Sequence, residues 1–162
     1  MPIIEIRKDI EALTMTVVAR FAAPVTRVWT AYADPRQLGR FWGPPAWPAT
    51  FVRHDFVVGG RSEHYMTGPD GQHSRGFFEF LAIEEPHAFE VLDGFLGPDG
   101  KPAEGMPTMR MRFTFEPDEG GTRMVTVTTF PSPQALEQLL GMGMEEGMRA
   151  AMSQIDAVLA SD

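Results

Sequence analysis

The chain has 162 residues, 43% of them hydrophobic and 22% charged, which is enough to bury a core, so we expect one domain over residues 1–162. It has no cysteine, which excludes disulfides, thiolate catalysis and sulfur-bound zinc. The net charge of −8 repels phosphate backbones and argues against a nucleic-acid partner. No apolar run reaches the roughly 18–20 residues of a membrane span, and charges interrupt the N-terminus where a signal peptide is apolar. These features predict a cytoplasmic protein without a membrane span.

The N-terminal part predicts one strand followed by two short helices. Residues 13–22 alternate between apolar and polar side chains, which is the period of a half-buried strand. Pro24 suits the first position of a helix, and apolar residues follow it at helical spacing: Val25, Val28, Trp29 and Tyr32. Asp34 and Pro35 indicate a second helix start, a capping side chain with proline behind it.

The middle of the chain predicts antiparallel strands joined by turns. We expect them at residues 49–58, 61–67, 74–85, 88–95, 108–116 and 122–130. Residues 94–107 are rich in glycine and proline and form a loop too long for a tight hairpin. The register of residues 74–95 stays open, because both faces are apolar: Phe78 and Phe80 against Phe77, Leu81 and Ile83.

A long C-terminal helix completes the predicted order. Ser132 and Pro133 indicate its start, and apolar residues then recur at spacings of three and four over about seven turns. A hairpin-connected sheet has one wet and one dry face, and this helix would cover the dry one. The order of elements predicts an α+β fold.

The motifs of the chain resemble those of the heat-shock protein 90 ATPase activator homologue family, within the START/polyketide-cyclase (SRPBCC) superfamily. Residues 21–44, FAAPVTRVWTAYADPRQLGRFWGP, contain the A-P-x-x-x-V-W, D-P and W-G-P steps of that family. Later steps follow in the same order: Asp55, Gly59-Gly60-Arg61, Pro69-Asp70-Gly71, Pro86, Gly121-Thr122-Arg123, and GMEEG at 143–147. The resemblance covers roughly residues 13–160.

The resemblance implies a helix-grip fold, in which about seven antiparallel strands curl around a long C-terminal helix and enclose a cavity. It does not choose a chemistry, since members of the superfamily bind lipids, carry or cyclise polyketides, or assist a chaperone. The chain departs from its relatives in two places. Met148 replaces a usual tryptophan, and the strand at 61–67 turns Ser62, His64 and Met66 inward where relatives are apolar.

The stretch LLGMGMEEGM at residues 139–148 interleaves glycine with methionine inside the predicted helix. Gly141, Gly143 and Gly147 would let a ligand approach the backbone or let the helix bend, while methionines would line the space with adaptable surface. The alternative is close packing between sheet and helix, with methionine as ordinary filler.

The predicted binding residues lie on the faces expected to border the cavity. They are Trp42, Trp47, Ser62, His64, Met66, Phe78, Phe80, Met109, Met111, Phe113, Met144, Met148 and Met152. Trp42 and Trp47 flank a proline-rich turn, so each either guards the cavity mouth or anchors the turn.

His64 is the histidine that we expect inside, with Ser62, Glu63 or Glu79 as its hydrogen-bond partner. It is either a satisfied core residue or a candidate catalytic residue that orients a ligand or transfers a proton. No histidine pair has metal-binding spacing and no phosphate loop occurs, so the sequence predicts no metal and no cofactor.

Three functions remain open at this level. The first is binding of an apolar or aromatic small molecule between the sheet and the helix. The second is cyclase- or dehydratase-like catalysis with His64 as general base. The third is a protein-interaction module for a chaperone or similar partner, which requires an exposed apolar patch. A homodimer formed through a sheet edge or through the turn at Trp42–Trp47 is compatible with each of them.

Overall fold

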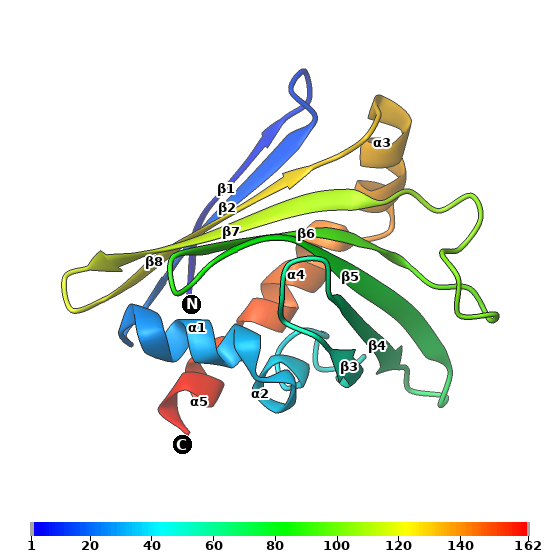
Figure 1. The fold of residues 1–162 in the computed structure, drawn as a ribbon. Coiled ribbons are helices and arrows are strands. Elements are labelled where there is room, and N and C mark those ends of the chain that lie inside the picture. Colours follow the sequence, from blue (N-terminus) through cyan, green and yellow to red (C-terminus); the bar gives the residue numbers. More distant parts are fainter. Residues whose placement is uncertain (1, 162) are drawn as a thin grey trace.

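An eight-stranded antiparallel sheet forms the frame of the protein and curves around helices that lie against its inner face (Figure 1). The computed structural model describes residues 2–161. The strand order is β1-β2-β8-β7-β6-β5-β4-β3. The strands are β1 (Ile3–Asp9), β2 (Thr14–Phe21), β3 (Ala49–His54), β4 (Arg61–Thr67), β5 (His73–Glu84), β6 (Ala88–Phe95), β7 (Met109–Asp118) and β8 (Gly121–Thr129). The helices are α1 (Val25–Ala33), α2 (Pro35–Gly39), α3 (Pro133–Gly141), α4 (Met144–Met152) and α5 (Ile155–Ala160).

This architecture confirms the predicted α+β helix-grip fold, with one strand more than expected. The additional strand is β1, which pairs with β2 at the sheet edge and places Ile6 opposite Val17. Its side chains are exposed or half-buried, so its sequence, IIEIRKD, lacks the alternation that identifies a strand with one buried face. The half-buried Ile3 and Ile6 pack against the core, and the backbone ladder with β2 adds hydrogen bonds along the strand.

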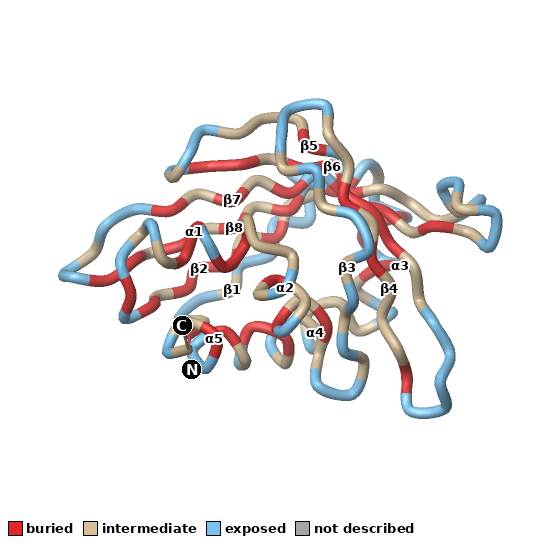
Figure 2. Tube along the Cα trace, turned by 60° about the horizontal axis from the view of Figure 1, so that its bottom comes forward, coloured by how far each residue is buried: buried red, intermediate tan, exposed pale blue. Residues whose placement is uncertain are grey.

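The central strands show the predicted division between an inner and an outer face. In β7, Met109, Met111, Phe113 and Phe115 are buried. The alternate residues Arg110 and Arg112 point outward, where both lie within salt-bridge distance of Glu90 on β6. Figure 2 shows buried residues along the central strands and on the helical segments that face them. The inner face of the sheet is the main surface that the helices must cover.

The helix starts follow the predicted capping chemistry. The Asp34 side chain accepts a hydrogen bond from the Arg36 amide at 3.0 Å, ahead of Pro35 at the first position of α2. Ser132 does the same for the Ala135 amide at 3.1 Å at the start of α3. Each cap satisfies a backbone donor that has no partner within its own helix.

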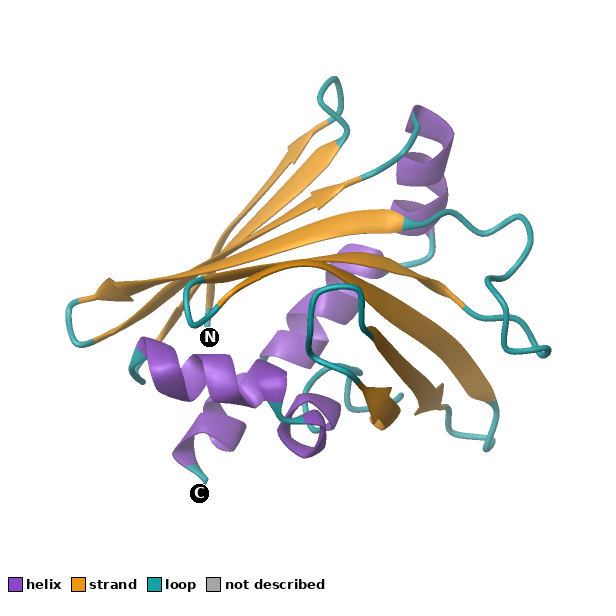
Figure 3. Ribbon diagram, in the orientation of Figure 1, coloured by secondary structure: helices purple, strands orange, loops and turns teal. Residues whose placement is uncertain are grey.

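The C-terminal helix differs from the prediction because it is broken twice, giving α3, α4 and α5. Gly143, between α3 and α4, has φ of 85°. This left-handed conformation costs an L-residue about 1–2 kcal/mol, so glycine is the residue that suits it. Figure 3 shows the result: α3 lies near one end of the sheet, whereas α4 runs beneath the strands.

The three glycines of this region therefore do different work. Gly143 supplies the left-handed turn, and Gly141 ends α3. Gly147 lies within α4, and a Cβ added there would meet no heavy atom within 4 Å. Close packing against the sheet does not explain Gly147.

We predict that Gly143→Ala and Gly147→Ala change stability in opposite directions. The first variant forces alanine into a left-handed conformation and should lower the free energy of unfolding by about 1–2 kcal/mol. The second replaces a helical glycine that has open space around it and should raise stability by roughly 0.5–1 kcal/mol. Urea unfolding followed by circular dichroism measures both. Equal effects from the two substitutions would contradict the assigned break.

Candidate functional site

A cavity of about 270 Å³ lies between the inner face of the sheet and α4. Strands β4 to β8 form one wall, and α4 forms the opposite wall with Met144, Gly147, Met148, Ala151 and Met152. Tyr32 of α1 and the segment after α2, including Phe41 and Trp42, border one end. The volume is many times that of one water molecule, which occupies about 30 Å³ of liquid.

Most of the predicted binding residues lie on the walls of this cavity. They are Trp42, His64, Met66, Met109, Met111, Phe113, Met144, Met148 and Met152. Most of these residues share a face of their own element. Alternate residues of β4 and β7 point inward, and every fourth residue of α4 faces the sheet. The flexible thioether chains give the walls a surface that can adapt to a guest.

The other predicted residues do not border the cavity. Phe78 packs edge-on against Trp42, with ring centroids 4.8 Å apart, and Phe80 packs against Phe56 at 5.0 Å. Both phenylalanines border a separate void of about 10 Å³, which is too small for a ligand. Trp47 lies against Gly68, where an added Cβ would come 2.6 Å from the indole. Trp47 therefore anchors its turn.

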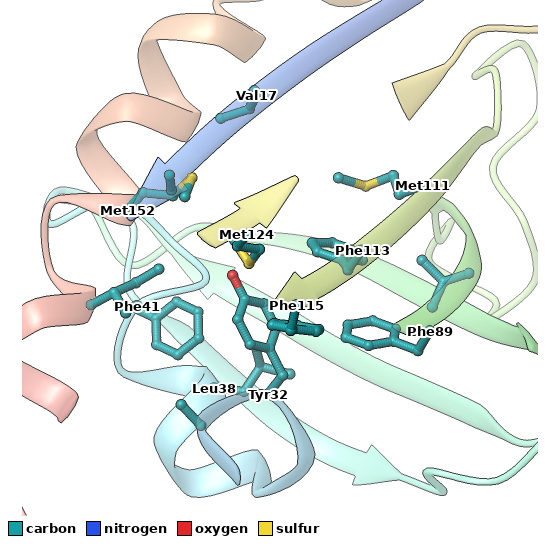
Figure 4. Close-up of a cluster of buried hydrophobic side chains, with 14 of the residues drawn as sticks. Val17, Tyr32, Leu38, Phe41, Phe89, Met111, Phe113, Phe115, Met124 and Met152 are labelled. Atoms are coloured by element: carbon teal, nitrogen blue, oxygen red, sulfur yellow. The ribbon is translucent and has the colours of Figure 1, made fainter. Parts of the chain in front are cut away.

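Aromatic rings fill the adjoining part of the interior. Phe89 stacks on Phe113 with centroids 4.5 Å apart, and the Tyr32 ring lies 5.5 Å from Phe113 and 5.6 Å from Phe115. Figure 4 shows the side chains of Tyr32, Phe89, Phe113 and Phe115 close together, with Met111 and Met152 in the same cluster. The interior near α1 is thus closely packed with aromatic rings, and the cavity lies next to it, where methionines of β4, β7 and α4 form much of the wall.

Ser62 binds a different histidine from the one expected. Its hydroxyl lies 2.8 Å from Nδ1 of His54, which stands opposite it in the β3–β4 ladder. Nε2 of His54 lies 3.1 Å from the Tyr32 carbonyl. A carbonyl can only accept, so Nε2 donates to it, and Nδ1 of the neutral ring is left as an acceptor. The single proton of the Ser62 hydroxyl is shared between this Nδ1 and the Arg53 carbonyl, which lies 3.2 Å from Oγ. The prediction that His64 is the histidine inside is incomplete, because His54 is also half-buried and fully hydrogen-bonded.

His64 is buried, as predicted, but none of its expected partners reaches it. It is 5% exposed, and its Nδ1 has no hydrogen-bond partner among the described residues. Gly76 lies opposite on β5 and leaves room for the ring, since a Cβ there would come 2.8 Å from Cε1 of His64. Burial lowers the pKa of His64 to about 4, so the imidazole is neutral at physiological pH.

Asp93 on β6 is a cavity residue that the sequence analysis missed. It borders the cavity and stands opposite Phe78 on β5 and Met109 on β7. Burial raises its pKa to about 7, and a hydrogen bond from the Gly94 amide opposes this only in part. A signal was present: Phe89, Val91, Asp93 and Phe95 share one face by strand alternation, so an acid interrupts an apolar row.

The described residues offer no obvious place for a metal. Between residues 2 and 161, no group of three or more histidine, aspartate or glutamate side chains could hold a metal ion. Over the same residues, no helix is long and apolar enough to cross a membrane. The polar groups that the sheet contributes to the cavity are instead spread over four strands: His64 on β4, Ser74 and Arg75 on β5, Asp93 on β6 and Thr126 on β8.

Comparisons with known proteins place this geometry among its relatives. The family profile described as activator of Hsp90 ATPase homolog 1-like protein matches residues 22–160. Protein Ms6760 from Mycobacterium smegmatis is 48% identical, with a TM-score of 0.91 and 99% of each chain covered. A protein from Arthrobacter aurescens is also 48% identical, with a TM-score of 0.93 over 97% of this chain and 91% of that one. The AHSA1 protein from Silicibacter pomeroyi, 18% identical over 91% of this chain and 97% of that one, shares the fold with a TM-score of 0.72. No curated protein matches the chain.

Two titratable groups of the cavity, Asp93 and His64, should give the protein opposing pH dependences. The pKa of Asp93 rises from 3.8 to about 7, so its contribution to stability is complete below pH 4 and is lost as pH rises through 7. The pKa of His64 falls from 6.5 to about 4, so its contribution is complete above pH 6.5 and is lost as pH falls through 4. The two effects cover nearly the same pH range and partly cancel.

We therefore predict that removing one of the two groups reveals the pH dependence that the other gives to the free energy of unfolding. In Asp93→Asn, the free energy of unfolding should rise between pH 4 and 6.5 by up to roughly 3 kcal/mol. In His64→Gln, it should fall between pH 4 and 7 by up to roughly 4 kcal/mol. Urea unfolding at pH steps of one unit measures both profiles. Variants that keep the wild-type profile would show that neither group titrates in the way its burial implies.

Proposed function

The chain belongs to the activator of Hsp90 ATPase homolog 1-like family, and from that premise and its cavity we propose that it binds an apolar or aromatic small molecule. The observation that carries this proposal is the cavity of about 270 Å³ beside an interior that is otherwise closely packed. Protein cores normally contain few voids larger than a water molecule. A space of this size, lined by adaptable side chains, is better suited to a guest than to structural support alone.

The walls favour a ligand with one or two rings. Known ligand pockets are mostly about 300–1,000 Å³, so this cavity of about 270 Å³ lies just below that range. A two-ring compound that buries about 200 Å² of apolar surface would gain roughly 5 kcal/mol from the hydrophobic effect. The methionines of β7 and α4 can change rotamer at little cost, which favours a range of related shapes over a single one.

Opening of the cavity would involve α4. This helix begins after the left-handed turn at Gly143 and ends at Met152, and it forms one wall of the cavity. Its first turn is tied to the sheet edge by Lys8, whose Nζ lies 2.7 Å from the Glu145 carboxylate. Both side chains are partly exposed, so this ion pair is a weak tether. The arrangement supports entry of a ligand by movement of α4.

Two other functions receive less support. An interaction module for a chaperone requires a continuous apolar patch. Most of the exposed large apolar side chains are instead divided between the two edges of the sheet, with Ile4 and Ile10 in or just after β1, and Val52, Val57 and Val58 in or just after β3. Acid–base catalysis has a specific observation in its favour, since burial displaces the pKa values of Asp93 and His64 in opposite directions within one cavity. If the protein is a catalyst, it must convert a bound compound, and each of the substitutions Asp93→Asn and His64→Gln must abolish that conversion.

Filling the cavity tests the binding proposal. Met148→Trp places a large ring on the α4 wall and should weaken binding of the neutral fluorophore N-phenyl-1-naphthylamine at least tenfold. The matched control is Met142→Trp, because Met142 is 57% exposed and lies outside the cavity walls. Fluorescence titration gives both dissociation constants. Equal affinities in the two variants would show that the fluorophore binds elsewhere, and no binding to the wild-type protein would contradict the proposal.

A further inference from the structure

An apolar guest alone does not account for Asp93. Its carboxyl group lies at the cavity wall between Phe78 and Met109, its neighbours across the two adjacent ladders. An acid in such surroundings is costly when ionised unless a cation pairs with it. No lysine, arginine or histidine nitrogen lies within salt-bridge distance of Asp93 in residues 2–161.

The other charged and titratable groups around the cavity do not supply that cation. His64 of β4 is neutral, with its pKa lowered to about 4. Arg75 of β5 directs Nη1 toward the Gly97 carbonyl, at 3.4 Å, in the loop after β6. On β7 and β8 the cavity residues are apolar or, at Thr126, an uncharged hydroxyl, and α4 presents methionine, alanine and glycine. The hydroxyl of Tyr32 from α1 stays protonated, because burial raises its pKa.

The remaining walls suit a positive charge. Aromatic rings border the cavity, among them Trp42, Phe95 and Phe113, and the faces of such rings attract cations. The net charge of −8 adds a long-range field that draws cations toward the protein. A carboxyl group, aromatic rings and a negative field together make a site for a cation with an apolar body.

We propose that the ligand of this cavity is a hydrophobic organic cation, an amine with one or two rings whose ammonium group pairs with the Asp93 carboxylate. This inference rests on the proposed binding function and names the ligand class for it. The rings would lie against the methionines of β7 and α4, and the ammonium group would donate hydrogen bonds to the β6 carboxylate. His64, uncharged, allows the cation to approach without repulsion.

Binding of such a cation is linked to a proton on Asp93. The free protein holds this carboxyl partly protonated near neutral pH, because burial raises its pKa to about 7. Only the ionised form pairs with an ammonium group, so affinity should rise about tenfold per pH unit below 7 and level off above it. An uncharged isostere should show no such dependence.

The experiment uses three compounds of matched shape: 1-naphthylmethylamine, 1-naphthylmethanol and 1-naphthoate. Isothermal titration calorimetry of the wild-type protein at pH 6 and pH 8 should show the amine binding at least tenfold more tightly than the alcohol at pH 8. Its advantage should shrink at pH 6. Asp93→Asn should weaken amine binding at least tenfold and change alcohol binding less than threefold. The matched control is Glu90→Gln, since Glu90 lies on the outer face of the same strand, near Arg110 and Arg112, and this variant should bind like wild type.

Each outcome decides between the two proposals. If the alcohol binds as well as the amine, or if Asp93→Asn leaves the amine affinity unchanged, the ligand class is wrong and the binding function survives. If 1-naphthoate binds most tightly, Arg75 is the recognising group and the inference is again wrong. If none of the three compounds binds, the proposed function fails together with the inference. The wild-type pH comparison is decisive even if Asp93→Asn proves unstable.

Discussion

The structure depends on one constraint: the apolar inner face of a curved antiparallel sheet must be removed from water. The helices that cover this face differ in how much of the space beneath them their side chains fill. Toward α1, large rings do this completely. Trp29 lies 5.8 Å from Phe89 and 5.6 Å from Phe115 in edge-to-face contacts, which leaves little free volume. Toward α4, the cover is a short helix whose cavity-facing residues are methionine, alanine and glycine, and a cavity remains between them and the sheet. The cavity is what remains between these two kinds of packing.

The same burial determines the chemistry of the cavity. Asp93 and His64 lie on different strands, and desolvation is the largest cause of both pKa displacements, upward for the acid and downward for the base. Each group is therefore held toward its uncharged form, which keeps the walls compatible with an apolar guest. The difference between them lies in what each would gain from a partner. An unpaired carboxyl gains most from a cation, whereas the neutral imidazole of His64, whose ring centroid lies 4.8 Å from that of Phe51, carries no charge that needs a partner.

Much of the candidate site was predictable because strand alternation specifies which side chains share a face. Met109, Met111 and Phe113 on β7 and His64 and Met66 on β4 were found in this way, and all border the cavity. The predictions that were wrong depended on which strands and rings pack against each other, and alternation does not specify this. Ser62 contacts His54 because the two residues stand opposite each other in the β3–β4 register. Phe78 and Phe80 pack against Trp42 and Phe56 and do not border the cavity. The sequence shows Asp93 as an acid within an apolar row of β6. Because the register of residues 74–95 was undecided, the sequence did not show that this row faces the cavity.

The sequence by itself determined the α+β class, seven of the eight strands and the capped helix starts at Asp34 and Ser132, and its motifs resembled those of the family. The strands and helix starts arise from local rules of period, capping and turn formation, which act over a few residues. The tertiary structure alone decided that the edge strand β1 joins the sheet and that the last helix breaks at Gly143. It also decided that an empty space lies beside Asp93. Free volume and desolvation are collective properties of side chains brought together from distant parts of the chain, so no local pattern encodes them.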